Sequence, residues 1–326
     1  MAVRVRSFFF VFFFFLVAGC AEPLRPPYIK PELHNWPETY QGTHGLGLHV
    51  FQTGTLTLPG RLVYEGGSAF TPTELDVLVF VIEHPTRGLV LFGTGLNHGI
   101  AENSEVYLEA VLAAVGKAEL QEGQHIGAQL ETARLAADRV THVIMPDLRP
   151  DHAGELEYFS EAVAVVTQAE QAAARGQSGQ SELGGYLPKE YDQVDKWEFI
   201  DFGQAEPLGM FVDHQDLFGD GSVVLLDATG MTAGGLAVLV RLPNEPVLLC
   251  GNLAWTKEQY LYTRLPGLVF DRGGWWDKVW RLKKWKELAP ELVILPDHEW
   301  TAVEAVATGD MQLHRFETEE EEGEKT

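Results

Sequence analysis

The sequence predicts a mixed α/β domain that extends over residues 44–313. Short apolar, β-like runs alternate with helix-like stretches along this region, and glycine- and proline-containing turn signals separate them. With 326 residues and a hydrophobic content of 45%, the chain is long enough to bury a substantial core. Neither internal repeats nor an inner linker is apparent, so we expect one domain rather than two.

Several segments have the composition of β-strands. Their residues are mostly Val, Leu, Ile and Phe, and turn-forming residues bound them. They are residues 47–53, 75–83, 89–92, 140–145, 163–167, 222–226, 237–242, 247–250 and 292–295.

Helix-like stretches lie between these strands. Residues 105–115 and 127–137 carry apolar side chains at three- and four-residue spacing, and residues 168–175 are rich in alanine. Residues 275–286 combine tryptophans with lysines, which predicts an amphipathic helix whose aromatic side chains pack on the domain. Stacking on a cofactor is the alternative role for these tryptophans.

The N-terminus has the features of an export signal. Basic residues precede an apolar run at residues 8–17, which is too short to span a bilayer comfortably. The small residues before Cys20 resemble a bacterial lipobox, so we expect removal of residues 1–19, lipidation of Cys20 and a proline-rich tether over residues 20–43. The alternative is a plain signal peptide or a short anchor. Because no aspartate follows the cysteine, the resemblance implies the outer membrane of a bacterial cell envelope, with the protein facing the periplasm.

Charge and cysteine content narrow the set of partners. The formal net charge of −23 disfavours nucleic acid and anionic lipid surfaces. Residues 314–326 form an acidic tail that should be disordered, because its like charges repel one another. After lipidation of Cys20 the remaining thiol is Cys250, so no internal disulfide can form. Its apolar surroundings predict an inert core residue.

The most informative segment is Met145-Pro-Asp-Leu-Arg-Pro-Asp-His-Ala-Gly154. It has the outline of a two-metal hydrolase loop, His-x-His-x-Asp-His, with half of its ligands replaced. Two neighbouring cations need imidazole and carboxylate ligands, and an arginine cannot supply either. The sequence therefore excludes an ordinary dinuclear centre.

An ordered set of segments resembles the metallo-β-lactamase superfamily, most closely the group that includes N-acyl homoserine lactonases. The set contains the metal loop with its preceding strand, and further segments along residues 75–300. These are Leu89-Val-Leu-Phe-Gly-Thr-Gly95, the hairpin at residues 217–226, Thr229-Gly-Met-Thr-Ala-Gly-Gly235, Leu248-Leu-Cys-Gly-Asn252, Trp255-Thr-Lys-Glu258 and Val293-Ile-Leu-Pro-Asp-His298. The resemblance implies a four-layer αββα sandwich, the metallo-β-lactamase fold, with the site at one edge of the two sheets.

The resemblance places the first metal at Asp147, Arg149 and Met231, where all three expected histidines are absent. A guanidinium keeps its proton and a thioether is a weak donor, so this position cannot hold zinc. Arg149 could instead pair with Asp147 or Asp151 and replace the charge of a metal with an internal ion pair.

The second metal position falls on Asp151, His152 and His298. Asn252 stands in the place of the bridging carboxylate and is a further candidate metal ligand, although its neutral amide is a poor bridge. One carboxylate and two imidazoles are enough protein ligands for a catalytic zinc that keeps a place for water. We therefore expect one zinc, or another divalent metal, or no metal at all. The competing interpretation is that Asp151 caps a helix that begins near residue 153, while the two histidines are buried and hydrogen-bonded.

Two functions follow. The interpretation that we favour at this stage is a pseudoenzyme that binds a small-molecule ligand or an envelope protein. The alternative is a mononuclear metal-dependent hydrolase of a lactone, ester or amide, with Asp147 as the general base, Arg149 stabilising the oxyanion and Asp151 holding the metal.

Overall fold

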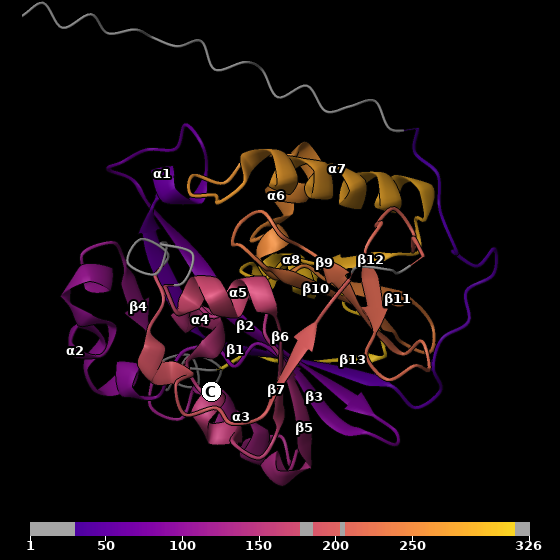
Figure 1. Ribbon diagram of the computed structural model, residues 1–326. Coiled ribbons are helices and arrows are strands. Elements are labelled where there is room, and N and C mark those ends of the chain that lie inside the picture. The colour runs from indigo at the N-terminus through magenta and orange to yellow at the C-terminus, as the bar shows by residue number, and fades with distance from the viewer. Residues whose placement is uncertain (1–29, 177–184, 203–205, 317–326) are drawn as a thin grey trace, which may run out of the picture.

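The computed structural model describes residues 30–176, 185–202 and 206–316, and these residues form two β-sheets with helices on their outer faces (Figure 1). The larger sheet has the strand order β13-β1-β2-β3-β5-β6-β7, with β4 paired to β1, and the smaller has the order β12-β11-β10-β9-β8. This arrangement confirms the predicted four-layer sandwich. The predicted signal peptide, residues 20–29 of the predicted tether including Cys20, and residues 317–326 of the predicted acidic tail lie outside the described residues.

The strands of the larger sheet are β1 (Gly47–Pro59), β2 (Pro72–His84), β3 (Gly88–Phe92), β4 (Lys117–Glu119), β5 (Val140–Ile144), β6 (Val163–Thr167), β7 (Trp197–Ile200) and β13 (Met311–His314). Those of the smaller sheet are β8 (His214–Asp216), β9 (Val223–Asp227), β10 (Leu236–Arg241), β11 (Pro246–Leu249) and β12 (Val293–Leu295).

The helices are α1 (Gly60–Val63), α2 (Gly99–Ala113), α3 (Ile126–Thr132), α4 (Pro150–Ala153), α5 (Gln168–Ala174), α6 (Lys257–Tyr262), α7 (Arg272–Leu288) and α8 (Trp300–Glu304). The backbone of α2 leaves the helical conformation at Asn103 and Glu109. Side-chain caps define two of the other helix starts: Thr167 accepts from the backbone of Glu170, and Asp271 accepts from Gly273 and Gly274.

The alternation of side chains along each strand creates the layers. In β2, Phe80 packs between the two sheets, while its neighbour Val81 packs against the helices on the outer face. In β10, Val238 faces the larger sheet and Leu239 faces α7. Both faces of each sheet are therefore apolar, which explains why the central strands have continuous rather than alternating hydrophobic sequences.

The tryptophan-rich helix α7 covers the smaller sheet (Figure 1), and its aromatic side chains pack on the domain as predicted. Trp275, Val279, Leu282 and Trp285 are fully buried in this layer. Their spacing of three and four residues places them on one face of the helix. The tryptophans therefore have packing roles, and the alternative of cofactor stacking finds no support in these positions.

The ends of the domain extend beyond the predicted limits of residues 44–313. Trp36 packs edge-on against Trp285 with ring centroids 5.0 Å apart, and the Tyr40 hydroxyl donates to the carbonyl of Leu242 at 2.6 Å. At the other end, β13 pairs in parallel with β1, and His314 stacks on Phe51 at 4.3 Å. These contacts add both segments to the packed domain.

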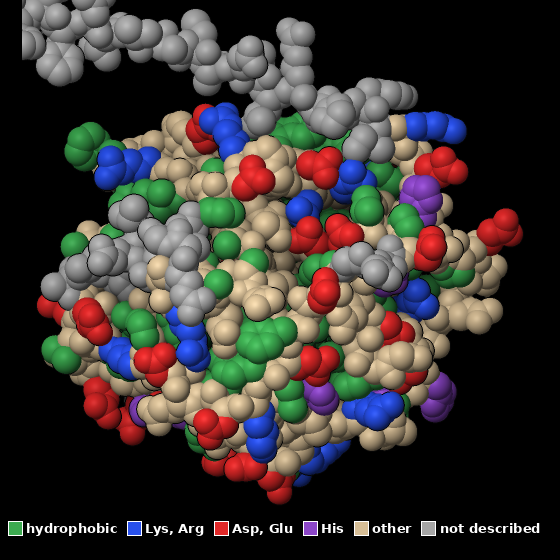
Figure 2. Space-filling view, viewed as in Figure 1, with side chains coloured by type: hydrophobic (Ala, Val, Ile, Leu, Met, Phe, Trp, Pro, Cys, Tyr) green, Lys and Arg blue, Asp and Glu red, His purple; other side chains and the backbone are tan. Residues whose placement is uncertain are grey.

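The described helices do not include one that is long and apolar enough to cross a membrane. On the face shown in Figure 2, acidic and basic side chains are interspersed with apolar ones. Among the described residues, side chains of neither sign gather into one large patch on this face.

Candidate metal centre

The turn after β3 holds residues 145–154, which follow β5 and include α4, through backbone hydrogen bonds. Thr94 donates from both its backbone nitrogen and its hydroxyl to the carbonyl of His152, at 2.7 and 2.8 Å. The backbone nitrogen of Gly154 donates to the carbonyl of Gly95 at 3.0 Å. Gly95 has a φ of +68°, a conformation that glycine adopts without strain. These bonds position Asp151 and His152 whether or not a metal is bound.

An ion pair occupies the first metal position. Arg149 Nε donates to Asp147 Oδ2 at 2.6 Å, and its Nη2 donates to Asn252 Oδ1 at 2.6 Å. Asn252 Nδ2 closes the ring by donating to Asp147 Oδ2 at 2.6 Å. The predicted pairing of Arg149 with Asp147 is therefore confirmed.

Asp147 is completely buried, and burial alone would raise its pKa. The positive charges of Arg149 and His152 outweigh this effect and hold the pKa of Asp147 below its usual value. Its Oδ1 accepts from the Arg149 backbone and from His152, and its Oδ2 accepts from Arg149 and Asn252. A carboxylate with its lone pairs used in this way is a poor general base, so the geometry favours an anchoring role for Asp147.

Trp255 forms one wall of the ion-pair network. Its Nε1 donates to Asn252 Oδ1 at 2.5 Å, and the Arg149 guanidinium lies 5.6 Å from its ring centroid. Asn252 therefore joins Arg149 to Trp255, and its amide oxygen is already occupied by two donors. This geometry disfavours the predicted role of Asn252 as a metal ligand.

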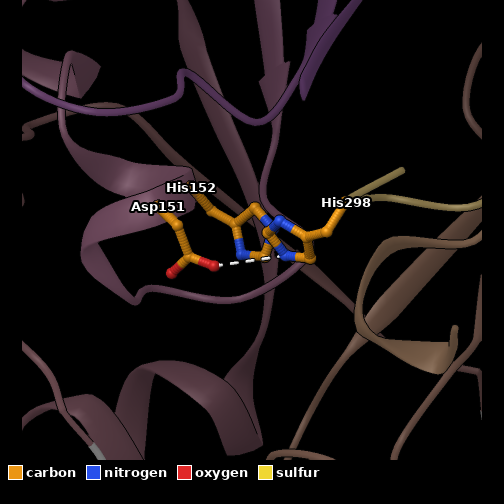
Figure 3. Close-up of side chains that lie close together, drawn as sticks. All are labelled: Asp151, His152 and His298. Atoms are coloured by element: carbon orange, nitrogen blue, oxygen red, sulfur yellow. Dashed lines mark ion pairs between the residues drawn. The ribbon is translucent and has the colours of Figure 1, made fainter. Parts of the chain in front are cut away.

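The second metal position is formed by Asp151, His152 and His298 (Figure 3). One ligand atom from each residue lies within 4.8 Å of the other two. His298 Nε2 is 3.4 Å from Asp151 Oδ2. Asp151 lies inside α4 and forms no cap hydrogen bond, because Arg149 is the N-cap residue. The alternative that Asp151 caps a helix is therefore wrong.

The donor set of this position fits a divalent metal. His298 Nδ1 donates to the carbonyl of Asp76 at 2.7 Å, which orients the ring with Nε2 3.4 Å from Asp151 Oδ2. His298 Nε2 is buried and has no hydrogen-bond partner among the described residues. An unpartnered imidazole nitrogen that faces a carboxylate is the arrangement a metal would complete. The first position, where Arg149 carries a fixed positive charge, does not fit one.

His152 bridges two buried carboxylates. Its Nδ1 lies 2.7 Å from Asp147 Oδ1, and its Nε2 lies 2.6 Å from Asp297 Oδ2. Burial opposes a charged imidazole, but Asp151, Asp147 and Asp297 together raise the pKa of His152 well above its usual value. Each ring nitrogen of His152 thus lies at hydrogen-bond distance from one buried carboxylate.

A cavity of about 290 Å³ opens onto the centre. Arg149, Asp151, Trp255 and His298 lie on its wall. The rest of its lining is mostly apolar and includes Leu56, Leu58, Leu62, Leu75, Leu96, Leu108, Val115 and Leu268. The centre thus lies beside a space that suits a hydrocarbon chain.

Comparison with known proteins agrees with this arrangement. The family model of the metallo-beta-lactamase superfamily matches residues 72–298. This chain belongs to the metallo-β-lactamase superfamily.

Several characterised members of the superfamily are similar to this chain. N-acyl homoserine lactonase AttM of Agrobacterium fabrum is 26% identical over 224 residues, which are 68% of this chain and 81% of that protein. AttM of Azorhizobium caulinodans is 25% identical over the same shares. A B. thuringiensis AiiA variant with N-decanoyl-L-homoserine at its active site superposes with a TM-score of 0.67 at 18% identity, covering 81% of this chain and 97% of that one. The structural match supports the fold alone.

The remaining predicted position of the first metal, Met231, is only 5% exposed and lies in the core beneath α7. Its carbonyl accepts from the backbone of Phe270 at 3.2 Å. The residues at the three places of the first metal thus form a buried thioether and an ion pair, and neither Met231 nor Arg149 is a suitable zinc ligand. Cys250 is fully buried, as predicted, and burial raises the pKa of its thiol well above the usual value.

Sequence reasoning missed three residues of the centre. Asp297 directly precedes His298 in the turn after β12, so an acidic residue beside a predicted ligand was a signal that could have been used. Trp255 and the buried Glu170 lie in other segments, and only folding brings them to the loop. Glu170 Oε1 accepts from the backbone of Leu148 at 3.2 Å, and its Oε2 accepts from Gly234 at 3.1 Å. It thereby joins the metal loop to the segment that carries Met231.

Proposed function

We propose that this protein is a one-metal hydrolase of small lactones or esters that carry an acyl chain. The observation that carries the proposal is the apolar cavity that ends on Arg149, Asp151 and His298. A ligand with a hydrocarbon chain and a polar ester head would place its head at the centre and its chain among the leucines. The lactonase activity of the AttM relatives supports this choice of substrate class.

Asp151, His152 and His298 would hold the metal. When bound, a divalent cation polarises an ester carbonyl and makes water more acidic. His298 is oriented by its bond to the carbonyl of Asp76, and the turn after β3 holds the backbone of His152. The backbone frame is therefore in place, but one nitrogen of His152 would have to exchange its contact with Asp147 or Asp297 for the metal.

Arg149 would orient the substrate. Its Nε and Nη2 are used by Asp147 and Asn252, whereas the guanidinium itself lines the cavity. A remaining N–H can donate to the carbonyl oxygen of an ester, where negative charge develops during hydrolysis. Asp147 would position Arg149, because its Oδ2 accepts from Arg149 Nε at 2.6 Å.

The test combines metal analysis with turnover. The full chain, purified with zinc or manganese present, should retain about one equivalent of metal and hydrolyse part of an N-acyl homoserine lactone and aryl ester panel. Turnover should be lost in the Asp151→Ala and His298→Ala variants. It should survive in His142→Ala, because His142 lies on β5 and bonds to its neighbour Thr141 instead of the centre. Metal content below about a tenth of an equivalent would remove the proposal.

A second candidate function is ligand binding without turnover. The ring of hydrogen bonds among Asp147, Arg149 and Asn252 favours it, because this ring keeps the loop folded without the first metal. The partner would be a small amphiphilic molecule or an envelope protein. Quenching of Trp255 fluorescence by an acyl lactone that is recovered unhydrolysed would support binding alone. Metal-dependent turnover that Asp151→Ala abolishes would contradict it.

We also propose that the protein is attached to the outer membrane by a lipid on Cys20. The lipobox-like sequence supports this location. Expression of the full chain in a bacterial host and separation of its membranes tests it. The native chain should sediment with the outer membrane, and Cys20→Ala should release it or leave it unprocessed. Equal distribution of both forms would contradict the proposal.

A further inference from the structure

We propose that the mouth of the apolar cavity docks on a zwitterionic phospholipid membrane, from which acyl-chain ligands enter the cavity. The inference deepens the proposed function and rests on its choice of an acyl-chain ligand. Four side chains form the docking surface, which we call the apolar rim: Phe70, Val115, Leu268 and Phe270. They are 98%, 41%, 52% and 47% exposed, respectively.

The apolar rim is continuous with the cavity. Val115 and Leu268 are exposed on the outside of the molecule, and both also line the cavity. The backbone nitrogen of Leu268 donates to the carbonyl of Leu62, a further lining residue, at 3.3 Å. Val269 packs against the core beneath α7 and anchors the segment, while its neighbours Leu268 and Phe270 stay exposed. An acyl chain can therefore pass from the rim into the cavity along apolar side chains.

Phe70 lies in the loop between α1 and β2, and backbone bonds hold this loop beside the rest of the rim. The nitrogen of Arg61 donates to the carbonyl of Ser68 at 2.9 Å, and the nitrogen of Glu65 donates to the carbonyl of Leu265 at 2.9 Å. Figure 2 shows apolar side chains that protrude over α1, at the upper left. Single exposed apolar residues are common, but several around the mouth of an apolar cavity mark an interaction site.

The charges around the rim suit a zwitterionic surface. Arg264 pairs with Glu258 at 2.5 Å and Arg272 pairs with Glu65 at 2.8 Å, so these side chains neutralise one another. Arg61 is exposed on α1. Its guanidinium can donate to a lipid phosphate while its alkyl part lies along apolar chains. An anionic surface is disfavoured by the net charge of −23.

The start of the described chain lies on the same side of the molecule as the rim. Leu33 and Trp36 pack against the cluster that α7 covers, and α1 and α7 both lie along the upper edge in Figure 1. The segment from Cys20 to Lys30 spans at most about 35 Å when fully extended. A lipid on Cys20, as proposed above, would therefore keep this edge close to the membrane.

Quenching by brominated lipid tests the inference without relying on activity. The full chain is reconstituted into phosphatidylcholine vesicles with or without bromine on the acyl chains, and flotation confirms that each variant is attached. Phe70→Trp and Leu268→Trp place a new indole on the rim. Phe199→Trp is the control, because Phe199 is 45% exposed on β7, which Figure 1 places far from α1. The emission of the native chain is subtracted, and circular dichroism confirms folding.

Bromine quenches an indole only at close range, so the result reports which surface meets the acyl chains. Phe70→Trp and Leu268→Trp should lose more than about half of their added emission, and Phe199→Trp less than about a tenth. If Leu268→Trp does not fold, Phe70→Trp still decides, because this side chain is almost fully exposed. A further Phe70→Asp change should reduce the quenching of Leu268→Trp, whereas Phe199→Asp should leave it unchanged.

Equal quenching at positions 70 and 199, or no quenching at either, would overturn the inference. Failure of the full chain to float with the vesicles would overturn it as well. In each of these cases, turnover of a water-soluble short-chain lactone still decides separately whether the protein is a hydrolase. Quenching confined to the rim without turnover of any lactone would remove the hydrolase and support the docking surface.

Discussion

Arg149 should contribute far more to stability than an ordinary arginine, because its guanidinium pairs with a completely buried carboxylate inside the loop. Its side chain is 16% exposed, and it pairs with the completely buried Asp147 at 2.6 Å. In Arg149→Ala, Asp147 would keep its bonds from Asn252 and His152 but lose its strongest positive neighbour. Breaking a buried pair by removing one partner costs about 3–5 kcal/mol, so we expect a loss of that size in the free energy of unfolding.

Urea denaturation of a double-mutant cycle measures this loss. The cycle comprises the native protein, Arg149→Ala, Asp147→Asn and the double variant, all at one pH and salt concentration. Since the double variant leaves no uncompensated charge, it should be more stable than Arg149→Ala, and the coupling free energy should reach about 1–3 kcal/mol. The exposed pair of Arg139 and Glu83, 3.0 Å apart with side chains 45% and 36% exposed, is the control.

For the control, Arg139→Ala should cost less than about 1 kcal/mol. If Arg149→Ala costs no more than Arg139→Ala, the guanidinium does not stabilise the loop and the argument for a replaced metal charge fails. If the coupling between positions 147 and 149 is near zero, Arg149 stabilises the loop through packing on Trp255 instead.

Three further predictions concern other parts of the molecule. Burial, and next the charge of Asp147, raise the pKa of Glu170 to about 7 in the folded protein. In the unfolded chain the same carboxyl loses its proton near the ordinary glutamate pKa of 4.5. Stability should therefore fall by on the order of 3 kcal/mol as the pH rises from about 4.5 to about 7, and urea denaturation should show a smaller fall in Glu170→Gln. In Leu58→Trp the indole should fill part of the apolar cavity and displace about three methylenes of a long acyl chain, each worth about 0.8 kcal/mol. Calorimetry should therefore show that the affinity for a long-chain acyl lactone falls more than about tenfold, while the affinity for a short-chain lactone is unchanged. In Gly154→Ala the new Cβ would overlap the backbone of Asn97, so thermal unfolding should show a loss of about 1–3 kcal/mol, whereas Gly309→Ala, with open space around it, should be neutral.

The core strands were predictable because both of their faces are buried. Residues 163–167 have a continuous apolar sequence, and the structure makes them β6 with the same bounds. Short edge strands were not predictable in this way. β8 contains His214, Gln215 and Asp216, whose polar side chains give no strand signal, and it forms only because β9 offers it a partner.

The sequence by itself determined which positions of the centre can bind a metal, because metal binding depends first on residue type. An arginine at position 149 excludes a metal ligand there in any fold, because a guanidinium keeps its proton. The retained Asp151, His152 and His298 likewise predict a second position, and the structure brings their ligand atoms within 4.8 Å.

Only the tertiary structure decided how the remaining polar groups are used. From the sequence, Asp147 could be either a general base or the ion-pair partner of Arg149. Its hydrogen bonds to Arg149, His152 and Asn252 favour the second role. The place of Asp297 between two histidines also depends on the ends of β5 and β12 meeting at one edge of the two sheets. Hydrogen bonds and charges act over a few ångströms, so their partners come from folding rather than from spacing along the chain.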